Sequence, residues 1–390
     1  MDIQAVNRPP AACHDEPARC FVAIELSKKN WPIAVVTPLG SKIAVYTLPA
    51  GDGPALLAKL NKVRWRVQHE LGRPVEMVSC YEAGYDGFWL HRLLTAHGID
   101  NHVLDPASVQ VNRRARRVKT DRIDLQGLLR ALMAHRRGEP RVDSVVRVPS
   151  VDEEDANRLH RERDRLIRER VQHVNRIKGL CAGQGTYDYE PIRVTRWQRL
   201  DTLCIGDGRG LPVRLRAEIE RELRRLELVL EMIAALEAER NAIAAATSTA
   251  HPQAGKIATL ARLKGIGPEF ATVLAGEVFY RSFDNRRQLA SYVGLASSPF
   301  TSGRLNRDQG ISKAGNRRIR TLSIEMAWAW LRFQPNSKLT LWYNRRFASG
   351  GKRMRKIGIV AVARRLLIDI WKYLDKGIVP EGARLRPMTS

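Results

Sequence analysis

Four carboxylates stand at positions from which they could bind a divalent metal ion. Glu25 lies in the apolar segment FVAIELS, and Glu82 ends the apolar segment VSCYE. Asp121 and Asp124, in KTDRIDLQ, are three residues apart and therefore share one face of a helix. Hard divalent cations prefer carboxylate oxygens, and phosphoryl transfer profits from metals that hold the attacking and leaving oxygens. This set predicts a Mg²⁺ site for phosphoryl-transfer chemistry.

The two pairs of acids differ in how strongly they indicate such a site. Asp121 and Asp124 have an ordinary alternative, because aspartates commonly cap or solvate the start of a helix. Glu25 and Glu82 lie in apolar segments, where acids seldom occur without a role because burying a charge costs free energy. The prediction of a metal site therefore depends mainly on Glu25 and Glu82.

A serine in a basic stretch is a second candidate for chemistry. Ser302 lies in the polar segment PFTSGRLNRDQG, close to Arg304, Arg307 and Lys313. A serine hydroxyl attacks a phosphodiester only when it is deprotonated or positioned by its neighbours, and cations can absorb the charge that develops. An exposed loop serine is more commonly a solvated residue. Composition alone leaves both interpretations of Ser302 open.

The segment LKGIGPEFATVL (263–274) has the form of a helix-hairpin-helix motif. Gly265 and Gly267 form a turn after an apolar residue, and Pro268 stands where the following helix would start. The backbone N–H groups of such a turn and the helix N-terminus can hold a phosphate without reading sequence. The alternative is an ordinary glycine-containing turn between helices. Pro268 favours the phosphate-binding interpretation.

The charge balance points to a polyanionic partner. The 390 residues include 66 Lys and Arg against 41 Asp and Glu, which gives a net charge of +25. Residues 311–390 alone hold 18 basic and 4 acidic side chains. Such a field makes association with nucleic acid fast and salt-sensitive. The expected contact residues are Lys313, Arg317, Arg318, Lys352, Arg353, Arg355 and Lys356, together with Arg304 and Arg307.

Composition argues against several other classes of protein. No apolar run approaches the ~20 residues needed to cross a bilayer, and the first residues contain no apolar core typical of a secretory signal. The five cysteines form no CxxC pair and have no histidine at zinc-finger spacing. We therefore expect a protein of the reducing cytoplasm with no membrane partner.

The acids need a scaffold, and the first part of the chain supplies the pattern of one. After a leader over 1–19 that is expected to be disordered, three apolar runs of strand length form a meander, and helices then alternate with strands. This order, together with the carboxylates, predicts an α/β domain of the ribonuclease-H-like kind over 20–150. The expected strands are Phe21–Leu26, Trp31–Thr37, Lys42–Leu48, Val75–Tyr81 and His102–Leu104, and the expected helices are Pro54–Glu70, about Gly87–His97 and one from Asp121.

The middle of the chain, 151–250, is long, charged and helical in pattern. Apolar residues recur at spacings of four and three, which is typical of a coiled-coil seam. Either an intramolecular helical hairpin or a dimerisation arm explains this seam, and the loop 181–211 would join its two helices. A mostly α domain with a basic tail is expected over 251–390. The seam residues are Ile219, Leu223, Leu226, Leu230 and Ile233.

Taken together, these segments resemble the insertion-sequence-110 family of transposases, which combine four acids with a serine. The resemblance covers about residues 20–375 in family order. The segments that carry it are AIELSKKNW, YEAGYDGFWLHRLL, KTDRIDLQGLL, LKGIGPEFATVLAGEV, RQLASYVGL, SGRLNRDQGISKAGNRRIR and GKRMRKIGIVAVARRLL.

The resemblance implies a role for each candidate residue. The four acids of the family's RuvC-like domain fall on Glu25, Glu82, Asp121 and Asp124, where they would hold Mg²⁺, and its nucleophilic serine falls on Ser302. It further implies a composite centre between protomers of a dimer or tetramer that acts on DNA near the bacterial nucleoid. It also implies target choice by a structured RNA that the element encodes.

One position departs from the family pattern and keeps two alternatives open. The first acid of the family is normally Asp, whereas this chain has Glu25. The extra methylene moves the carboxylate by about a bond length, and Mg²⁺ demands near-ideal octahedral geometry. A catalytically impaired nucleic-acid-binding protein is therefore one alternative to the transposase. A RuvC-like structure-specific endonuclease, which needs the acids but no serine domain, is the other.

Overall fold

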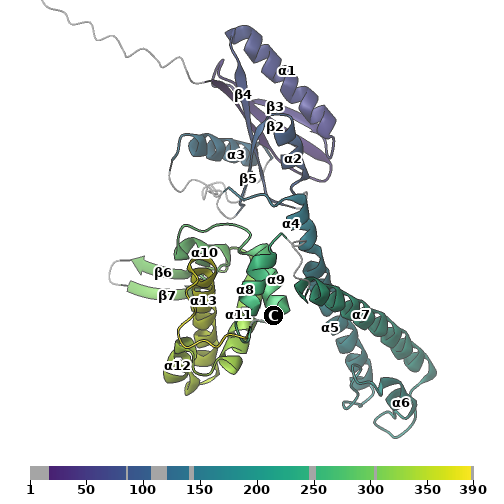
Figure 1. Ribbon diagram of the computed structural model, residues 1–390. Helices are drawn as coiled ribbons and strands as arrows, with labels where there is room; N and C mark the ends of the chain where they lie inside the picture. Colours follow the sequence, from purple (N-terminus) through teal and green to yellow (C-terminus); the bar gives the residue numbers. More distant parts are fainter. Residues whose placement is uncertain are drawn as a thin grey trace, which may run out of the picture. The chain divides into compact units, whose positions relative to one another are not determined.

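The computed structural model describes residues 17–84, 87–106, 121–139, 145–245, 252–302 and 305–387 (Figure 1). The chain divides into two compact units, Met1–Val148 and Pro149–Ser390, and each is described by itself. The expected leader lies largely outside the described residues. The first strand, however, begins at Ala18, so Ala18 and Arg19 belong to the sheet. None of the described helices is long and apolar enough to cross a membrane.

The first unit is built on a mixed five-stranded sheet with the order β3-β2-β1-β4-β5. The first three strands form an antiparallel meander, whereas β4 lies parallel to β1 and β5 lies parallel to β4. This confirms the α/β architecture expected from the order of apolar runs. The strands are β1 (Ala18–Ile24), β2 (Asn30–Val36), β3 (Ala44–Pro49), β4 (Val75–Glu82) and β5 (Asp100–Leu104).

Helices cover both faces of this sheet. Helices α1 (Gly53–Leu71) and α2 (Trp89–Ala96) pack on one face, over a core that includes Ile24 and Tyr81. Helix α3 (Asp121–Arg136) packs on the other face, over Ala23 and Cys80. Because neighbouring residues of a strand point to opposite faces, this division assigns every strand residue to one layer or the other.

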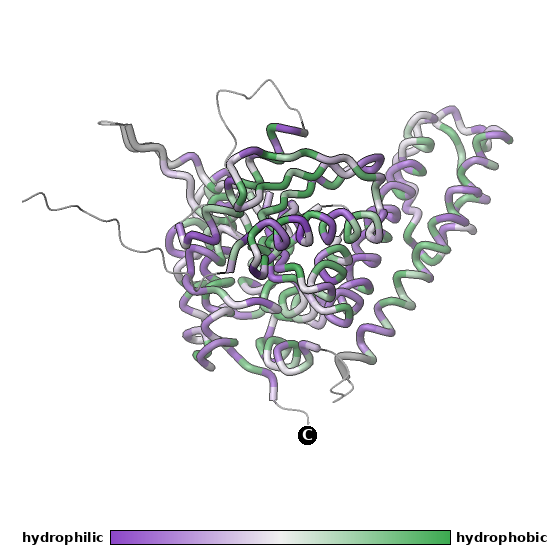
Figure 2. The backbone as a smooth tube through the Cα atoms, turned by 90° about the horizontal axis from the view of Figure 1, so that it is seen from above, coloured by the Kyte–Doolittle hydropathy of each residue, from purple (hydrophilic) through white to green (hydrophobic). Residues whose placement is uncertain are grey.

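The second unit begins with a long helical hairpin. After α4 (Val151–Ala156), helix α5 (Arg158–Ala182) packs antiparallel against α7 (Val213–Ala245), and the short α6 (Arg196–Asp201) lies in the connection. The predicted seam on α7 is buried or half-buried against α5, as the intramolecular hairpin requires. Figure 2 shows hydrophobic and hydrophilic stretches alternating along these two helices.

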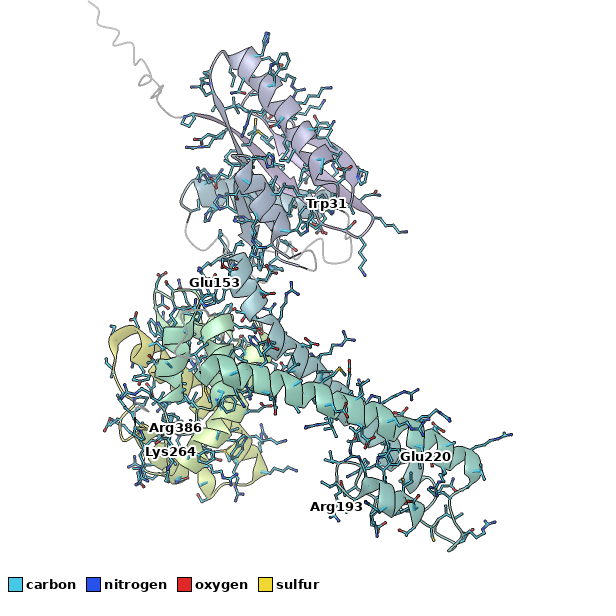
Figure 3. All side chains as sticks on the ribbon, turned by 45° about the vertical axis from the view of Figure 1, so that its right-hand side comes forward. Trp31, Glu153, Arg193, Glu220, Lys264 and Arg386 are labelled. Atoms are coloured by element: carbon cyan, nitrogen blue, oxygen red, sulfur yellow. The ribbon has the colours of Figure 1, made fainter. Side chains whose placement is uncertain are left out.

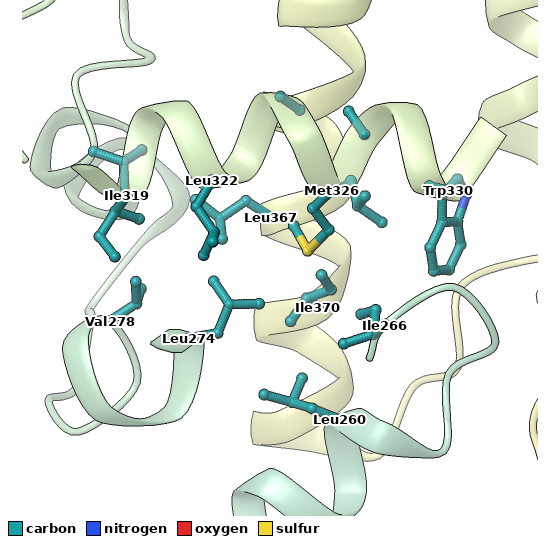
Figure 4. Close-up of a cluster of buried hydrophobic side chains, with 14 of the residues drawn as sticks. Leu260, Ile266, Leu274, Val278, Ile319, Leu322, Met326, Trp330, Leu367 and Ile370 are labelled. Atoms are coloured by element: carbon teal, nitrogen blue, oxygen red, sulfur yellow. The ribbon is translucent and has the colours of Figure 1, made fainter. Parts of the chain in front are cut away.

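The remainder of the second unit is a helical bundle around one large core. The bundle consists of α8 (Ala254–Ala261), α9 (Pro268–Glu277), α10 (Arg286–Tyr292), α11 (Arg317–Phe333), α12 (Lys338–Tyr343), the π-helical turn η2 (Asn344–Ala348) and α13 (Lys352–Lys376). Figure 4 shows α11 crossing α13, with Leu274 of α9 and Leu260 of α8 packed beneath Met326 and Leu367.

A β-hairpin projects from this mostly α bundle, and it corrects one expectation. Strands β6 (Ser297–Ser302) and β7 (Leu305–Ile311) pair antiparallel, with Phe300 opposite Arg307 and Ser302 opposite Leu305. The polar sequence around Ser302 is typical of a loop, but Ser302 is the last residue of β6. The polar sequence concealed the strand because the hairpin is held by backbone pairing and has few apolar side chains to alternate.

Candidate functional site

Two of the predicted acids lie side by side at one edge of the sheet. Strands β1 and β4 are parallel and pair Ile24 with Tyr81, so Glu25 and Glu82 occupy the next pair of positions. Glu25 follows the last residue of β1, and its N–H donates to the carbonyl of Pro32 at 3.0 Å, which extends the strand ladder. Neighbouring strands are about 4.8 Å apart. Both acids are half-buried, at the carboxyl ends of adjacent strands.

The same two acids face the layer of α3. Ile24 and Tyr81 belong to the core beneath α1 and α2, and Leu26 packs against that core as well. Strict alternation then places Glu25 and Glu82 on the opposite face, with α3.

Helix α3 brings a third acid to this edge. Its last turn lies at the start of β5, where Arg136 Nη1 pairs with Asp100 Oδ2 at 2.9 Å. Halfway along, the Sγ of Cys80 in β4 lies 3.6 Å from the carbonyl oxygen of Leu128. The helix therefore runs antiparallel to β4, and its first turn lies where β4 ends. Asp124, half-buried, is in that turn.

The donor chemistry at this edge fits a hard divalent cation. Glu25, Glu82 and Asp124 offer only carboxylate oxygens, the ligands that Mg²⁺ prefers. Within the described part of the chain, no three His, Cys, Asp or Glu side chains form a metal-binding group as they stand. The fourth predicted ligand, Asp121, starts α3, but its side chain lies outside the described residues.

A further acid at this edge was not singled out by the sequence analysis. Asp105 directly follows β5, one residue after Leu104, which pairs with Glu82 of β4. It is half-buried and stands at the carboxyl end of the neighbouring parallel strand, but Leu104 belongs to the core beneath α3, so alternation places Asp105 on the face opposite to Glu25 and Glu82. An acid immediately after the apolar run HVL was the signal that could have found it.

The hairpin that carries Ser302 is fixed to the bundle at its base. The N–H of Ser312 donates to the carbonyl of Ala296 at 2.8 Å, and that of Asn316 donates to the carbonyl of Tyr292 at 2.8 Å. Gly315 has a φ of +94°, and a Cβ there would lie 2.4 Å from the Tyr292 oxygen. Only glycine fits this position. The side chains of 300–308 lie outside the described residues, as does all of Arg304.

Beside this hairpin lies a basic groove of about 1350 Å³. It is formed by α10, the end of β7, η2 and α13, and Ser297 of β6 also lines it. The lining includes four of the predicted nucleic-acid contacts and contains no Asp or Glu. We call this cavity the basic groove. Its cations are Arg286, Arg287, Lys313, Arg346, Lys352, Arg353, Lys356, Arg364 and Arg365.

The other predicted contacts have different surroundings. Arg317 is exposed at the start of α11. Arg355 is also exposed, and its Nε donates to the carbonyls of Ala348 at 3.2 Å and Gly350 at 3.1 Å, next to the π-helical turn. Arg318 differs from the expectation, because its guanidinium is used within the protein. It is half-buried, pairs with Glu277 and Asp164, and donates to the carbonyl of His160 at 3.1 Å.

The buried carboxylate of Glu277 explains why the Arg318 side chain points into the second unit and not into solvent. Its carboxylate is 5% exposed and accepts hydrogen bonds from His160 Nε2 at 3.1 Å, Arg161 Nε at 2.8 Å and Arg318. Burial by itself raises the pKa of Glu277, but the hydrogen bond from His160 and the charge of Arg318 outweigh it and bring the pKa to about 2. The cluster joins α5, α9 and α11, so its role is structural.

The glycine turn between α8 and α9 has the expected helix-hairpin-helix form, and part of it is packed against the protein. Gly265 has a φ of +96°, and a Cβ there would lie 3.1 Å from the Cβ of Phe333. Gly267 is the N-cap of α9, and Pro268 is its first residue. The Lys264 N–H donates to the carbonyl of Arg384 at 3.1 Å, so the segment near Arg386 lies against the turn (Figure 3).

A family model and several known proteins are similar in sequence to this chain. The family model described as "Transposase IS116/IS110/IS902 family" matches residues 257–341, a span that includes the Ser302 hairpin. A putative transposase, y4rJ, of Sinorhizobium fredii is 47% identical over 393 residues, which cover 98% of this chain and 99% of that protein. The transposase for insertion sequence element IS1111A of Coxiella burnetii is 27% identical over 305 residues, 77% of this chain and 78% of that protein. The chain therefore belongs to the IS116/IS110/IS902 family of transposases, enzymes that act on DNA.

Proposed function

We propose that this transposase excises and inserts an insertion sequence by metal-assisted strand exchange, with Ser302 as the nucleophile. The observation that carries the proposal is the pairing of Glu25 and Glu82 at neighbouring positions of β1 and β4, at the edge where α3 begins with Asp121 and Asp124. Four carboxylates from three elements would then serve one metal site.

Each group has a defined part in the proposed reaction. The oxygen of Ser302 attacks the DNA phosphorus and forms a phosphoserine bond, while the displaced strand end leaves as an alcohol and takes up the serine proton. A second strand end reverses this step and frees the serine. Mg²⁺ held by Glu25, Glu82, Asp121 and Asp124 would neutralise charge on the phosphoryl oxygens. The cations of the basic groove hold the DNA backbone.

The acids and the serine belong to different units, so the proposed reaction needs both. We propose that they meet between protomers of a homo-oligomer, a dimer or a tetramer, at the nucleoid in the cytoplasm. The excess of basic side chains in residues 311–390 supports DNA as a partner and leaves room for a structured guide RNA as a second one. RuvC-like folding of the first unit is part of the same proposal.

A plasmid recombination assay tests the proposal as a whole. Purified protein, with the noncoding RNA of the element, is given donor and target plasmids with Mg²⁺ or with a chelator. The proposal expects recombinant junctions only with Mg²⁺. Cleavage without rejoining would indicate a structure-specific endonuclease instead. Binding without any cleavage would indicate an impaired nucleic-acid-binding protein, the alternative that Glu25 raises.

A further inference from the structure

Within the part of the chain that the structure describes, the nine cations of the basic groove have no salt-bridge partner. By contrast, several cations of the helical hairpin, including Arg176 and Arg196, are paired with acids. Arg163, for example, pairs with Glu237 at 2.6 Å. Asp369 attracts Arg365 electrostatically, but the groove keeps most of its positive field. It is also larger than the roughly 300–1,000 Å³ of ordinary small-molecule pockets. A polyanionic chain is the ligand that both properties fit.

Beneath its cations the groove is apolar, and this distinguishes between kinds of nucleic acid. Ile311, Ile357 and Val360, which we call the apolar floor, line it and are at least partly exposed, and Ile357 is 49% exposed. A duplex presents its phosphates outward and buries the faces of its bases. It therefore exposes no base face that could pack against these apolar side chains. An unpaired strand presents phosphates and base faces together, which is why proteins that bind single strands combine a positive groove with apolar and aromatic surfaces.

One wall of the groove also contains an arginine stacked on a tryptophan ring, an arrangement on which unpaired bases can stack. The guanidinium carbon of Arg365 lies 3.9 Å from the centre of the Trp342 ring, and both residues line the groove. Trp342 is itself braced edge-on by Phe347, with ring centres 5.2 Å apart. Aromatic rings and arginine planes are the surfaces on which unpaired bases stack.

The groove leads toward the proposed nucleophile. Ser297, at the start of β6, lines it, and Ser302 ends the same strand five residues later. Five residues of strand span about 17 Å. That is the length of about five nucleotides at stacked spacing. A strand lying in the groove can therefore continue along β6 to place a phosphodiester at Ser302.

We propose that the basic groove binds an unpaired stretch of the DNA strand that Ser302 attacks, with its phosphates on the cations and its bases on the apolar floor and the Trp342–Arg365 stack. The identity of this strand as DNA rests on the proposed function. The preference for an unpaired strand rests on the groove alone.

The test distinguishes the contribution of the apolar side chains to nucleic-acid binding from the contribution of the cations. Full-length protein is titrated, by fluorescence anisotropy, with an unstructured thymidine oligomer of about 20 nucleotides, with a duplex of equal length and with the matching uridine RNA. Ile357→Ser changes the apolar floor and leaves every cation in place. Met354→Ser is its matched control, because Met354 is 42% exposed on the same helix but does not line the groove.

We expect Ile357→Ser and Trp342→Ala each to weaken single-stranded DNA binding about fivefold or more, with duplex binding changed less than about twofold. Met354→Ser should bind as the wild type does. Equal losses for duplex and single strand, or no loss for Ile357→Ser, would overturn the proposal. Tighter binding of RNA than of DNA with the same dependence on Ile357 would show that the occupant is RNA, and the assignment to DNA would then be wrong.

The outcome is independent of the strand-exchange chemistry. If Ser302→Ala retains the preference for an unpaired strand while the wild type forms no covalent adduct with DNA, the groove is correct and the proposed nucleophile is not. If the adduct forms but Ile357→Ser has no effect on single-strand binding, the proposed nucleophile is correct and the assignment of the groove to an unpaired strand is wrong.

Discussion

Arg318, in the first turn of α11, forms an ion pair with Glu277 at the end of α9, inside the second unit. Through the same carboxylate, Glu277 accepts a hydrogen bond from His160 of α5. One buried acid therefore connects the helical hairpin to the bundle. It also fixes the N-terminus of α11, which directly follows the loop at the base of the Ser302 hairpin.

Replacing Glu277 with glutamine should strongly destabilise the second unit. The amide keeps the volume but removes one of the two carboxylates that compensate Arg318, while Asp164 remains. Breaking a buried ion pair typically costs about 3–5 kcal/mol, and we expect a loss toward the lower end of that range. The free energy of unfolding in urea measures the loss. Glu381→Gln is the matched control, since Glu381 pairs with Lys338 on an exposed surface and should contribute little. Unfolding of Glu277→Gln at the wild-type urea concentration would contradict the structural role.

The pKa of Glu277 makes a separate prediction about acid stability. It lies at about 2 in the folded protein, below its ordinary value of 4.5. A depressed carboxyl pKa stabilises the fold fully above the unfolded value, and this contribution is lost as the pH falls from about 4.5 toward 2. The difference in stability between wild type and Glu277→Gln should therefore shrink over this range. If the difference in the free energy of unfolding between wild type and Glu277→Gln is the same at about pH 6 and about pH 3, then the pKa of Glu277 is not lowered in the folded protein.

Neutralising the exposed cations of the basic groove should flatten the salt dependence of DNA binding. Each phosphate contact that is lost reduces the slope of log K against log salt by about 0.9. Replacing Lys352, Arg353 and Lys356 with glutamine should therefore reduce this slope by up to about 3. The same change at Arg214, Arg221 and Arg224 of α7 is the control and should leave the slope nearly unchanged. An unaltered slope in the groove variant would identify these cations as a solvated face.

The sequence predicted the position of the acids better than that of the cations. Glu25 and Glu82 end apolar runs, and parallel strands place such ends together, so local pattern and topology were sufficient. Arg318 looked like any other cation of the basic tail. Its partners Glu277 and Asp164 lie 41 and 154 residues away, and only the folded chain reveals them.

The hairpin was missed for a different physical reason. Its strands consist mainly of Ser, Asn, Asp, Gly and other polar residues, so they lack the alternation of apolar and polar residues, and contain few of the β-branched residues, that predict a strand. What stabilises it is backbone pairing and the close approach of Gly315 to Tyr292. The apolar floor of the basic groove could not be predicted from the sequence either, because Ile311 and Ile357 come from separate elements and form one surface only in the folded chain.

Substitutions at Glu25 test whether the longer acid still serves the proposed metal site. Glu25→Ala should abolish recombination, and Glu25→Asp should preserve or raise it, because aspartate is the family's usual residue there. Recombination in the plasmid assay is the measurement, with circular dichroism to show that each variant is folded. Asp52→Ala, which removes only the N-cap of α1, serves as a control for loss of stability. Wild-type recombination by Glu25→Ala would mean that the acid is structural.

Ser302 carries the final prediction, because the proposed strand exchange requires its oxygen to become bonded to DNA. A suicide DNA substrate, in which the cleaved end cannot be religated, should trap a covalent adduct that survives denaturation, and the linked peptide should contain Ser302. Ser302→Ala should lose this adduct while binding DNA nearly as well as wild type, since the hydroxyl contributes one polar contact among many cations. Ser302→Cys should retain at most trace activity, because a thiol attacks but differs in size and pKa.

The neighbouring serines make this experiment selective. Ser297 begins the same strand and lines the basic groove, and Ser312 is exposed just after β7. Alanine at either position should leave the adduct intact, because neither lies at the end of β6 where the proposed strand path reaches Ser302. An adduct that persists in Ser302→Ala would assign the nucleophile elsewhere. Cleavage by the wild type with no adduct at all would mean that water is the nucleophile, and the acidic edge of the sheet would then belong to a hydrolytic nuclease.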